Sequence, residues 1–128
     1  MTSEQRILVV DDNFDAAELL KILLEHHGFD VRTAYDGAEA LTIASDFHPH
    51  ITCSDLDMPI MSGFDLASAL RKTDFSHNTY LIAMTGLNTE ENYHSATRAG
   101  FDTCYMKPFS VDDLIDDVRS YFFKIQQP

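Results

Sequence analysis

The sequence has 128 residues, enough for one domain with a single buried core, and we expect that domain to span residues 1–128 with its core at about 6–124. No apolar run approaches the ~20 residues that cross a bilayer, and the first residues lack the basic-then-apolar order of a secretory signal, so we expect a cytoplasmic protein without a membrane segment. The formal net charge of −12 argues against direct binding of nucleic acid, whose phosphates are met by Lys and Arg, and leaves a basic protein partner open.

The chain begins with alternating strand and helix patterns. Arg6 to Val10 is a continuous apolar run, the pattern of a parallel strand buried on both faces. A helix is predicted from Phe14 to a stop at Gly28, and a short strand from Phe29 to Ala34. The inward stripe of that first helix is predicted to be Ala17, Leu20, Leu23, Leu24 and His27.

The middle of the chain continues the alternation. Asp36 and Glu39 form a capping-box pattern for a second helix, which ends before Pro49. Its inward residues are predicted to be Ala40, Leu41, Ala44 and Phe47. The third strand is predicted from Ile51 to Ser54, and a loop with two carboxylates follows it.

Three more helices and two more strands complete the prediction. Ser62, Thr89 and Ser110 are each placed to cap a helix. The strands between these helices are expected from Tyr80 to Met84 and from Phe101 to Met106. The inward residues of the last helix are Val111, Leu114, Ile115, Val118 and Phe122, and an exposed aromatic residue within Tyr121-Phe122-Phe123 would favour a partner surface.

Five strands alternating with five helices predict an α/β fold, a doubly wound parallel sheet with helices on both faces. The carboxyl ends of parallel strands share one edge of the sheet, so the residues that follow them are brought together there. These residues are Asp11, Asp12, Asp55, Thr85 and Lys107.

Such a cluster suits the handling of a phosphoryl group with a divalent cation. Neighbouring carboxylates repel one another unless some are protonated or a cation neutralises them. Magnesium is bound by one or two carboxylates plus phosphate and water, and an aspartate can act as nucleophile to form an acyl phosphate. The alternative is an ordinary loop in which Asp55 and Asp57 only favour the turn through hydrogen bonds to the backbone.

Four motifs at the predicted strand ends resemble those of the receiver domain of two-component response regulators. They are Ile7-Leu8-Val9-Val10-Asp11-Asp12-Asn13, the loop from Asp55 through Met58-Pro59 to Gly63, Met84-Thr85-Gly86 and Lys107-Pro108-Phe109. The resemblance runs from about Arg6 to Lys124. It implies the flavodoxin-like (βα)5 fold with strand order 2-1-3-4-5.

The resemblance also implies a role for each residue of the cluster. Asp55 would accept a phosphoryl group from a histidine kinase or a histidine phosphotransfer protein, and would later lose it to water. Mg²⁺ or Mn²⁺ would be held by the carboxylates of Asp12 and Asp55, by the backbone carbonyl of Asp57 and, through water, by Asp11. Thr85 would move to the phosphoryl oxygen, and Lys107, before a cis proline, would pair with the carboxylate or the phosphoryl group. Such a chain modifies itself and is not an enzyme that turns over a metabolite.

Phosphorylation would bias a surface from Thr89 to Lys124 that binds a downstream protein. At the position three before the lysine, where many receivers carry an aromatic switch residue, this sequence has Cys104, and alternation turns Tyr105 to the other face. Cys53 and Cys104 lie at no metal-ligand or redox spacing and are expected to be buried thiols. Together with Gly86, these features resemble receivers joined to hybrid sensor kinases.

Two other functions compete, and a third is disfavoured. Asp55-Leu56-Asp57 resembles the paired aspartates of haloacid-dehalogenase-type phosphatases, although Pro59 stands where that motif has a hydroxyl residue. A docking module with a receiver fold that works without phosphorylation would normally have lost a site residue, and none is missing. A flavodoxin-like cofactor site is disfavoured because the first loop is acidic and has no phosphate-binding cradle.

Overall fold

The computed structural model describes residues 4–86 and 89–126, which form one five-stranded parallel sheet with the order β2-β1-β3-β4-β5. The strands are Arg6–Val10 (β1), Asp30–Ala34 (β2), Ile51–Asp55 (β3), Tyr80–Thr85 (β4) and Thr103–Met106 (β5). The helices are Phe14–His26 (α1), Gly37–Phe47 (α2), Gly63–Arg71 (α3), Glu90–Ala99 (α4) and Val111–Ile125 (α5). The predicted α/β fold and its strand order are therefore confirmed.

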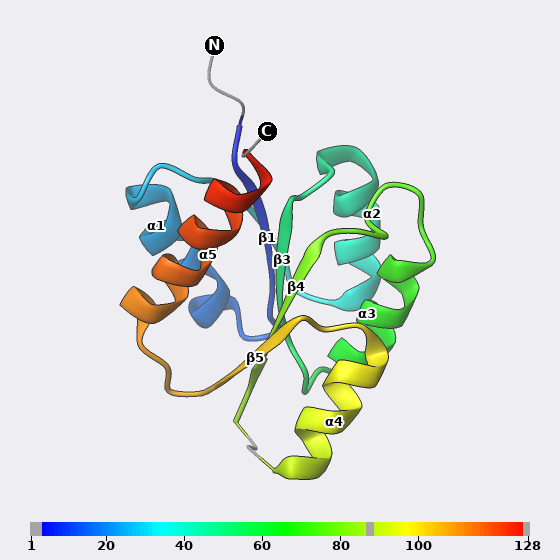
Figure 1. The fold of residues 1–128 in the computed structure, drawn as a ribbon. Helices are drawn as coiled ribbons and strands as arrows, with labels where there is room; N and C mark the ends of the chain where they lie inside the picture. The colour runs from blue at the N-terminus through cyan, green and yellow to red at the C-terminus, as the bar shows by residue number, and fades with distance from the viewer. Residues whose placement is uncertain (1–3, 87–88, 127–128) are drawn as a thin grey trace.

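The helices cover both faces of the sheet, with α1 and α5 on one side and α2, α3 and α4 on the other (Figure 1). Side chains alternate along the strands between two cores. Ile7 and Val9 point into the core under α1 and α5, whereas Leu8 and Val10 point into the core under α2, α3 and α4. A strand buried on both faces needs apolar residues throughout, which explains the unbroken run in β1.

Two strands start later than predicted because the residues expected to begin them are hydrogen-bonded to the ends of the preceding helices. The Phe29 N–H donates to the Leu24 carbonyl at the end of α1, and the Phe101 N–H donates to the Ala96 carbonyl at the end of α4. Both residues thus complete helix ends, and β2 and β5 begin one and two residues further on. His27, predicted to face inward, is exposed because it caps α1, where its ring contacts Arg119.

The predicted helix caps are confirmed at Ser62, Thr89 and Ser110, each of which accepts a backbone N–H three residues ahead. The capping box predicted for Asp36 and Glu39 is only half right. Asp36 accepts the Glu39 N–H at 2.7 Å, but the Glu39 carboxylate accepts the N–H of Tyr35, one residue before the cap. None of the helices in the described part of the chain is long and apolar enough to cross a membrane.

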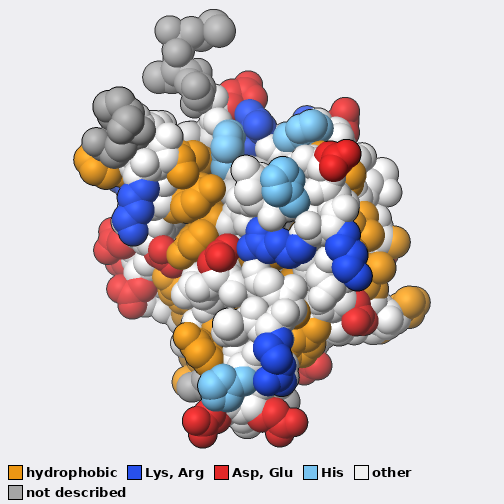
Figure 2. Space-filling model, turned by 45° about the vertical axis from the view of Figure 1, so that its right-hand side comes forward, with side chains coloured by type: hydrophobic (Ala, Val, Ile, Leu, Met, Phe, Trp, Pro, Cys, Tyr) orange, Lys and Arg blue, Asp and Glu red, His pale blue; other side chains and the backbone are white. Residues whose placement is uncertain are grey.

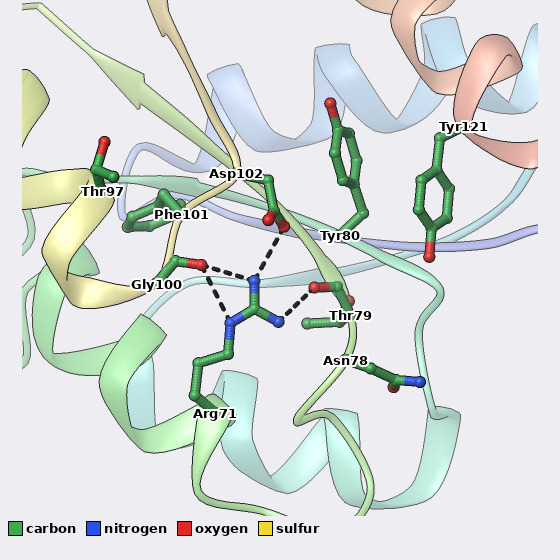
Figure 3. Close-up of a pocket in the computed structure, with 9 residues that line it drawn as sticks. All are labelled: Arg71, Asn78, Thr79, Tyr80, Thr97, Gly100, Phe101, Asp102 and Tyr121. Atoms are coloured by element: carbon green, nitrogen blue, oxygen red, sulfur yellow. Dashed lines mark hydrogen bonds and ion pairs between the residues drawn. The ribbon is translucent and has the colours of Figure 1, made fainter. Parts of the chain in front are cut away.

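A cavity of about 480 Å³ lies at the opposite edge of the sheet from the strand ends that carry the acidic residues. Arg71 of α3 lines it (Figure 3). Its guanidinium donates to the carbonyls of Gly100, Thr79 and His77 and to the carboxylate of Asp102. A guanidinium has five N–H groups, and these bonds engage all five, so Arg71 joins α3, the start of β4 and the end of α4 and has no donor left for a ligand.

Acidic and basic side chains are interspersed over the face shown in Figure 2. The excess of negative charge is therefore not gathered into one patch on that face.

Candidate functional site

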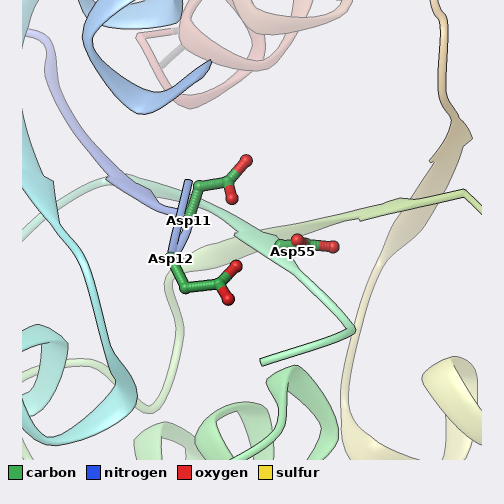
Figure 4. Close-up of side chains that lie close together, drawn as sticks. All are labelled: Asp11, Asp12 and Asp55. Atoms are coloured by element: carbon green, nitrogen blue, oxygen red, sulfur yellow. The ribbon is translucent and has the colours of Figure 1, made fainter. Parts of the chain in front are cut away.

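The carboxyl ends of β1 and β3 bring three acidic side chains together (Figure 4). Asp11, Asp12 and Asp55 each have a carboxylate oxygen within 4.8 Å of the others. Asp11 and Asp55 are buried, at 3% and 8% exposure, while Asp12 is exposed. Two carboxylates are thus withdrawn from water and the third opens the cluster to solvent.

Lys107 completes the cluster from the end of β5. Its Nζ lies 3.2 Å from Asp11 Oδ2 and 3.6 Å from Asp55 Oδ2. The backbone N–H of Lys107 donates to the carbonyl of Thr85 at 2.7 Å, which places the buried Thr85 at the same edge. The Lys107-Pro108 peptide is cis, as the resemblance implied.

Asp57 lies beside the cluster with its side chain exposed. Its backbone N–H donates to Asp55 Oδ1 at 3.3 Å, so the loop after β3 contacts the central carboxylate through main chain. The side-chain carboxylate of Asp57 is not part of the group of three.

Burial and neighbouring charge set the ionisation of the central pair. Burial, with smaller contributions from Asp11 and Asp12, raises the pKa of Asp55, and Lys107 opposes this rise. Burial disfavours the ammonium of Lys107, but the Asp55 and Asp11 carboxylates outweigh it and raise the Lys107 pKa. One ammonium cannot neutralise three carboxylates, so the donor set fits a hard divalent cation with oxygen ligands.

Gly63 approaches the central aspartate closely, a contact that no pattern in the sequence predicts. A Cβ at Gly63 would collide with the backbone carbonyl of Asp55 and lie 2.8 Å from the Cα of Leu56. The Gly63 N–H also donates to the Leu56 carbonyl at 3.0 Å. Gly63 begins α3 and, because it has no side chain, allows the loop to fold tightly against Asp55.

Asn13 is a second residue whose role at the site emerges from the structure. Its N–H donates to Asp11 Oδ1 and its side chain accepts the Ala16 N–H to cap α1. The cap pattern of an asparagine directly before a helix start was the signal that could have found it.

The two faces of β5 carry the residues that the alternation predicted. Cys104 packs against the core under α2, α3 and α4, and Tyr105 against the core under α5. Cys53 is fully buried as predicted, but Cys104 is only partly buried, because β5 is an edge strand.

An apolar groove of about 470 Å³ opens beside the Lys107 ammonium, between α1 and the turn after β5. Asp11 and Lys107 belong to its lining, so the groove is continuous with the acidic cluster. Its apolar lining includes Leu19, Leu20, Leu23, Met84, Phe109 and Val111.

Comparison with known proteins identifies the family of the chain that carries this acidic cluster. Residues 7–119 match the family model of the response regulator receiver domain. The chain belongs to this family. Receiver domains are phosphoryl-accepting signalling domains. Membership of this family therefore argues against the phosphatase and against the flavodoxin-like cofactor site.

Other receivers share both sequence and fold with this one. The DNA-binding response regulator MtrA of Mycobacterium tuberculosis is 34% identical over 119 residues, which are 93% of this chain and 51% of MtrA. The chain thus spans about half the length of MtrA. The receiver domain of Francisella response regulator 1452 has a TM-score of 0.87 and 32% identity, covering 96% of this chain and 100% of that one.

A third neighbour shares the fold alone. The receiver domain of sensor histidine kinase PA1611 from Pseudomonas aeruginosa has a TM-score of 0.84 at 22% identity, covering 93% of this chain and 98% of that one. That structure has a magnesium ion coordinated in its active-site cleft.

Proposed function

We propose that this receiver accepts a phosphoryl group from a phosphohistidine onto Asp55. The observation that carries the proposal is the convergence of Asp11, Asp12 and Lys107 on a buried Asp55 carboxylate, with Lys107 Nζ 3.6 Å from Asp55 Oδ2. Phosphoryl transfer needs mainly positioning and neutralisation of charge from a protein, and these residues are suited to both.

The ionised form of Asp55 reacts. A carboxylate oxygen of Asp55 attacks the phosphorus, the P–N bond to the donor imidazole breaks, and its electron pair stays on the imidazole nitrogen. An acyl phosphate forms on Asp55. Water later attacks the phosphorus of this acyl phosphate, which releases inorganic phosphate and restores the carboxylate, so the chain catalyses only its own modification and is no enzyme of metabolism.

The acidic cluster would hold Mg²⁺, or Mn²⁺, through the carboxylates of Asp12 and Asp55, the backbone carbonyl of Asp57 and a water on Asp11. The bound cation supplies neutralisation of the negative charge on the phosphoryl oxygens. The magnesium in the PA1611 receiver supports this assignment, as does the excess of three carboxylates over one ammonium here.

Lys107 and Thr85 act on the phosphoryl group. The Lys107 ammonium exchanges part of its contact with Asp55 for a phosphoryl oxygen. Its Nζ lies 3.6 Å from Asp55 Oδ2, so a phosphoryl group on Asp55 is within its reach. The Thr85 hydroxyl donates to another phosphoryl oxygen. The Thr85 carbonyl accepts the Lys107 N–H, which links the backbones of the two residues.

The phosphodonor is a histidine kinase or a histidine phosphotransfer protein. The groove between α1 and the turn after β5 is the surface we assign to it, because the groove reaches the acidic cluster and its rim carries the exposed Leu19. We place the chain in the cytoplasm with no membrane contact. That it does not bind nucleic acid directly stays a prediction, and the DNA-binding relative MtrA extends well beyond the matched half.

The output is a change in the surface from Thr89 to Lys124, which binds a downstream protein. Tyr93, Met106 and Phe123 are exposed on α4, β5 and α5 within this region, as expected for an apolar partner surface. We also infer that residues 1–128 form one receiver domain, supported by the family match over 7–119.

Incubation with acetyl phosphate and Mg²⁺, followed by intact-mass spectrometry, tests the proposal. The wild type gains one phosphoryl group and Asp55→Asn gains none. Absence of the modification in the wild type, or its persistence in Asp55→Asn, contradicts the proposal. Sustained turnover of a small phosphate ester would also contradict the proposal.

A further inference from the structure

Asp117 of α5 fastens two strands with one carboxylate. Its Oδ2 accepts the Tyr105 hydroxyl of β5 at 2.8 Å, and its Oδ1 accepts the Tyr80 hydroxyl of β4 at 3.0 Å. Hydrogen bonds to a carboxylate are stronger than those between neutral groups. Asp117 therefore anchors α5 to two neighbouring strands. Of these, β5 ends beside Lys107 and β4 ends at Thr85.

The bond to Tyr105 lies close to the phosphoryl site along the chain. Tyr105 comes two residues before Lys107, and its ring meets the ring of Phe109 edge-on, with centroids 5.7 Å apart. Tyr105 and Phe109 stand on either side of Lys107, so their contact closes the turn that carries the ammonium. The hydroxyl of Tyr105 then holds this closed turn against α5.

The bond to Tyr80 is chemically alike but remote from the site. Tyr80 begins β4, five residues before Thr85, and its ring stacks on Tyr121 of α5 with centroids 4.6 Å apart. Loss of this bond would loosen α5 without touching the turn at Lys107. The molecule thus offers an internal control for the bond of Tyr105.

We propose that Asp117 and Tyr105 are positioning residues for the phosphoryl site, which fix the end of β5 and thereby place the Lys107 ammonium between Asp11 and Asp55. This inference rests on the proposed function and deepens it. Coupling between two sites is reciprocal, so a phosphoryl group that engages Lys107 also changes the Tyr105–Asp117 bond and, through it, α5. This coupling runs through Tyr105 on the α5 face of β5. Cys104, at the position of the usual aromatic switch residue, lies on the opposite face.

The first test compares Tyr105→Phe with Tyr80→Phe. Each substitution removes one hydroxyl bond to Asp117 and keeps the ring, so both should lower the unfolding midpoint in urea similarly. With acetyl phosphate and Mg²⁺, phosphorylation should slow roughly tenfold in Tyr105→Phe and change less than about twofold in Tyr80→Phe, because small misplacement of a reacting group is costly. Equal rates for the two variants would overturn the inference.

The second test follows amide chemical shifts when beryllofluoride and Mg²⁺ bind. In the wild type, shifts should change at Asp57 and across residues 113–121 of α5. In Tyr105→Phe and Asp117→Asn, the change at Asp57 should persist and that in α5 should largely disappear. Asp116→Asn removes the same charge from an exposed position of α5 and should behave as the wild type. Persistence of the α5 change in Tyr105→Phe would overturn the inference.

The two proposals fail in different ways. If the wild type takes up no phosphoryl group from acetyl phosphate and shows no response to beryllofluoride, the proposed function is wrong and the inference falls with it. If the wild type and Tyr105→Phe are phosphorylated alike, only the positioning role of Asp117 and Tyr105 is wrong.

Discussion

Asp55 is held where its ionised form is unfavourable for the folded state. Its pKa is raised above the ordinary 3.8, chiefly by burial and further by Asp11 and Asp12. The folded protein therefore holds this proton more tightly than the unfolded chain does. The resulting contribution to stability is complete below pH 3.8 and is lost as the pH rises through the raised pKa.

We therefore expect Asp55→Asn to be more stable than the wild type at pH 7 in the absence of divalent cations. Its unfolding free energy should be higher by about 1 kcal/mol, and its unfolding temperature should rise accordingly. The advantage should shrink as the pH falls below the raised pKa. Calorimetry from pH 4 to 7 checks this, with Asp116→Asn, at an exposed position of α5, as the control. An Asp55→Asn variant less stable than the wild type at pH 7 would show that the cluster is not strained by charge.

Gly63, at the start of α3, and Gly86, directly after β4, allow a comparison of two glycines. Gly63→Ala would press a methyl group on the backbone of Asp55 and Leu56, whereas a Cβ at Gly86 meets no atom within 4 Å. We expect Gly63→Ala to cost roughly 2 kcal/mol of stability and to slow phosphorylation by acetyl phosphate, because the Asp55 loop must move. Gly86→Ala should fold normally. Urea unfolding measures the difference, and equal stability of the two variants would contradict the described packing.

Arg71 sets the arrangement of elements at the edge remote from the site. Its guanidinium engages three carbonyls and Asp102, a set that the three donors of lysine cannot match. We expect Arg71→Lys to lower the unfolding free energy by about 2 kcal/mol, since the partly buried carbonyls of Gly100 and Thr79 lose hydrogen-bond donors. Arg98→Lys, on the exposed face of α4, should have little effect.

The variants Arg71→Lys and Arg98→Lys also test whether the packing of α3 and α4 affects phosphorylation as well as stability. Because Arg71 contacts none of the acidic residues at the opposite edge, Arg71→Lys should still be phosphorylated at close to the wild-type rate at a temperature where it is folded. Rates from acetyl phosphate at 15 to 20 °C, about the usual temperature of maximum stability, check this. A large loss of rate in folded Arg71→Lys would mean that α3 and α4 control the site from this edge.

At the scale of the whole molecule, the order of elements followed directly from the sequence. The unbroken apolar run of β1, the helix stop at Gly28, and the caps at Ser62 and Ser110 are local signals, so they could be recognised one at a time. The convergence of Asp11, Asp55, Thr85 and Lys107 followed because parallel strands end at one edge.

Contacts between distant residues could not be predicted in this way. Arg71 with Gly100 and Asp102, and Asp117 with Tyr80 and Tyr105, depend on how helices sit on the sheet, which no local pattern encodes. The left-handed conformation of Ile60, at φ 70°, could not be predicted from the sequence either, since β-branched residues rarely adopt it. Packing of the whole chain determines such features.

Divalent cations should stabilise the folded molecule as a whole, because the assembled cluster exists only in the folded state. At about 100 times its dissociation constant, Mg²⁺ should add about 2.7 kcal/mol to the unfolding free energy of the wild type. Asp55→Asn should gain much less. Thermal unfolding across a magnesium titration, with potassium chloride matching the ionic strength, measures both, and an unchanged midpoint for the wild type would contradict a cation site at the cluster.

The central claim is that one carboxylate among several at this edge carries the phosphoryl group. Phosphorylation with acetyl phosphate and Mg²⁺, reduction of the acyl phosphate with borohydride and peptide sequencing by mass spectrometry would locate it directly. We predict that homoserine appears at position 55 and that Asp11, Asp12 and Asp57 stay unmodified. Homoserine at any of those three positions in place of position 55, or at none, would contradict it.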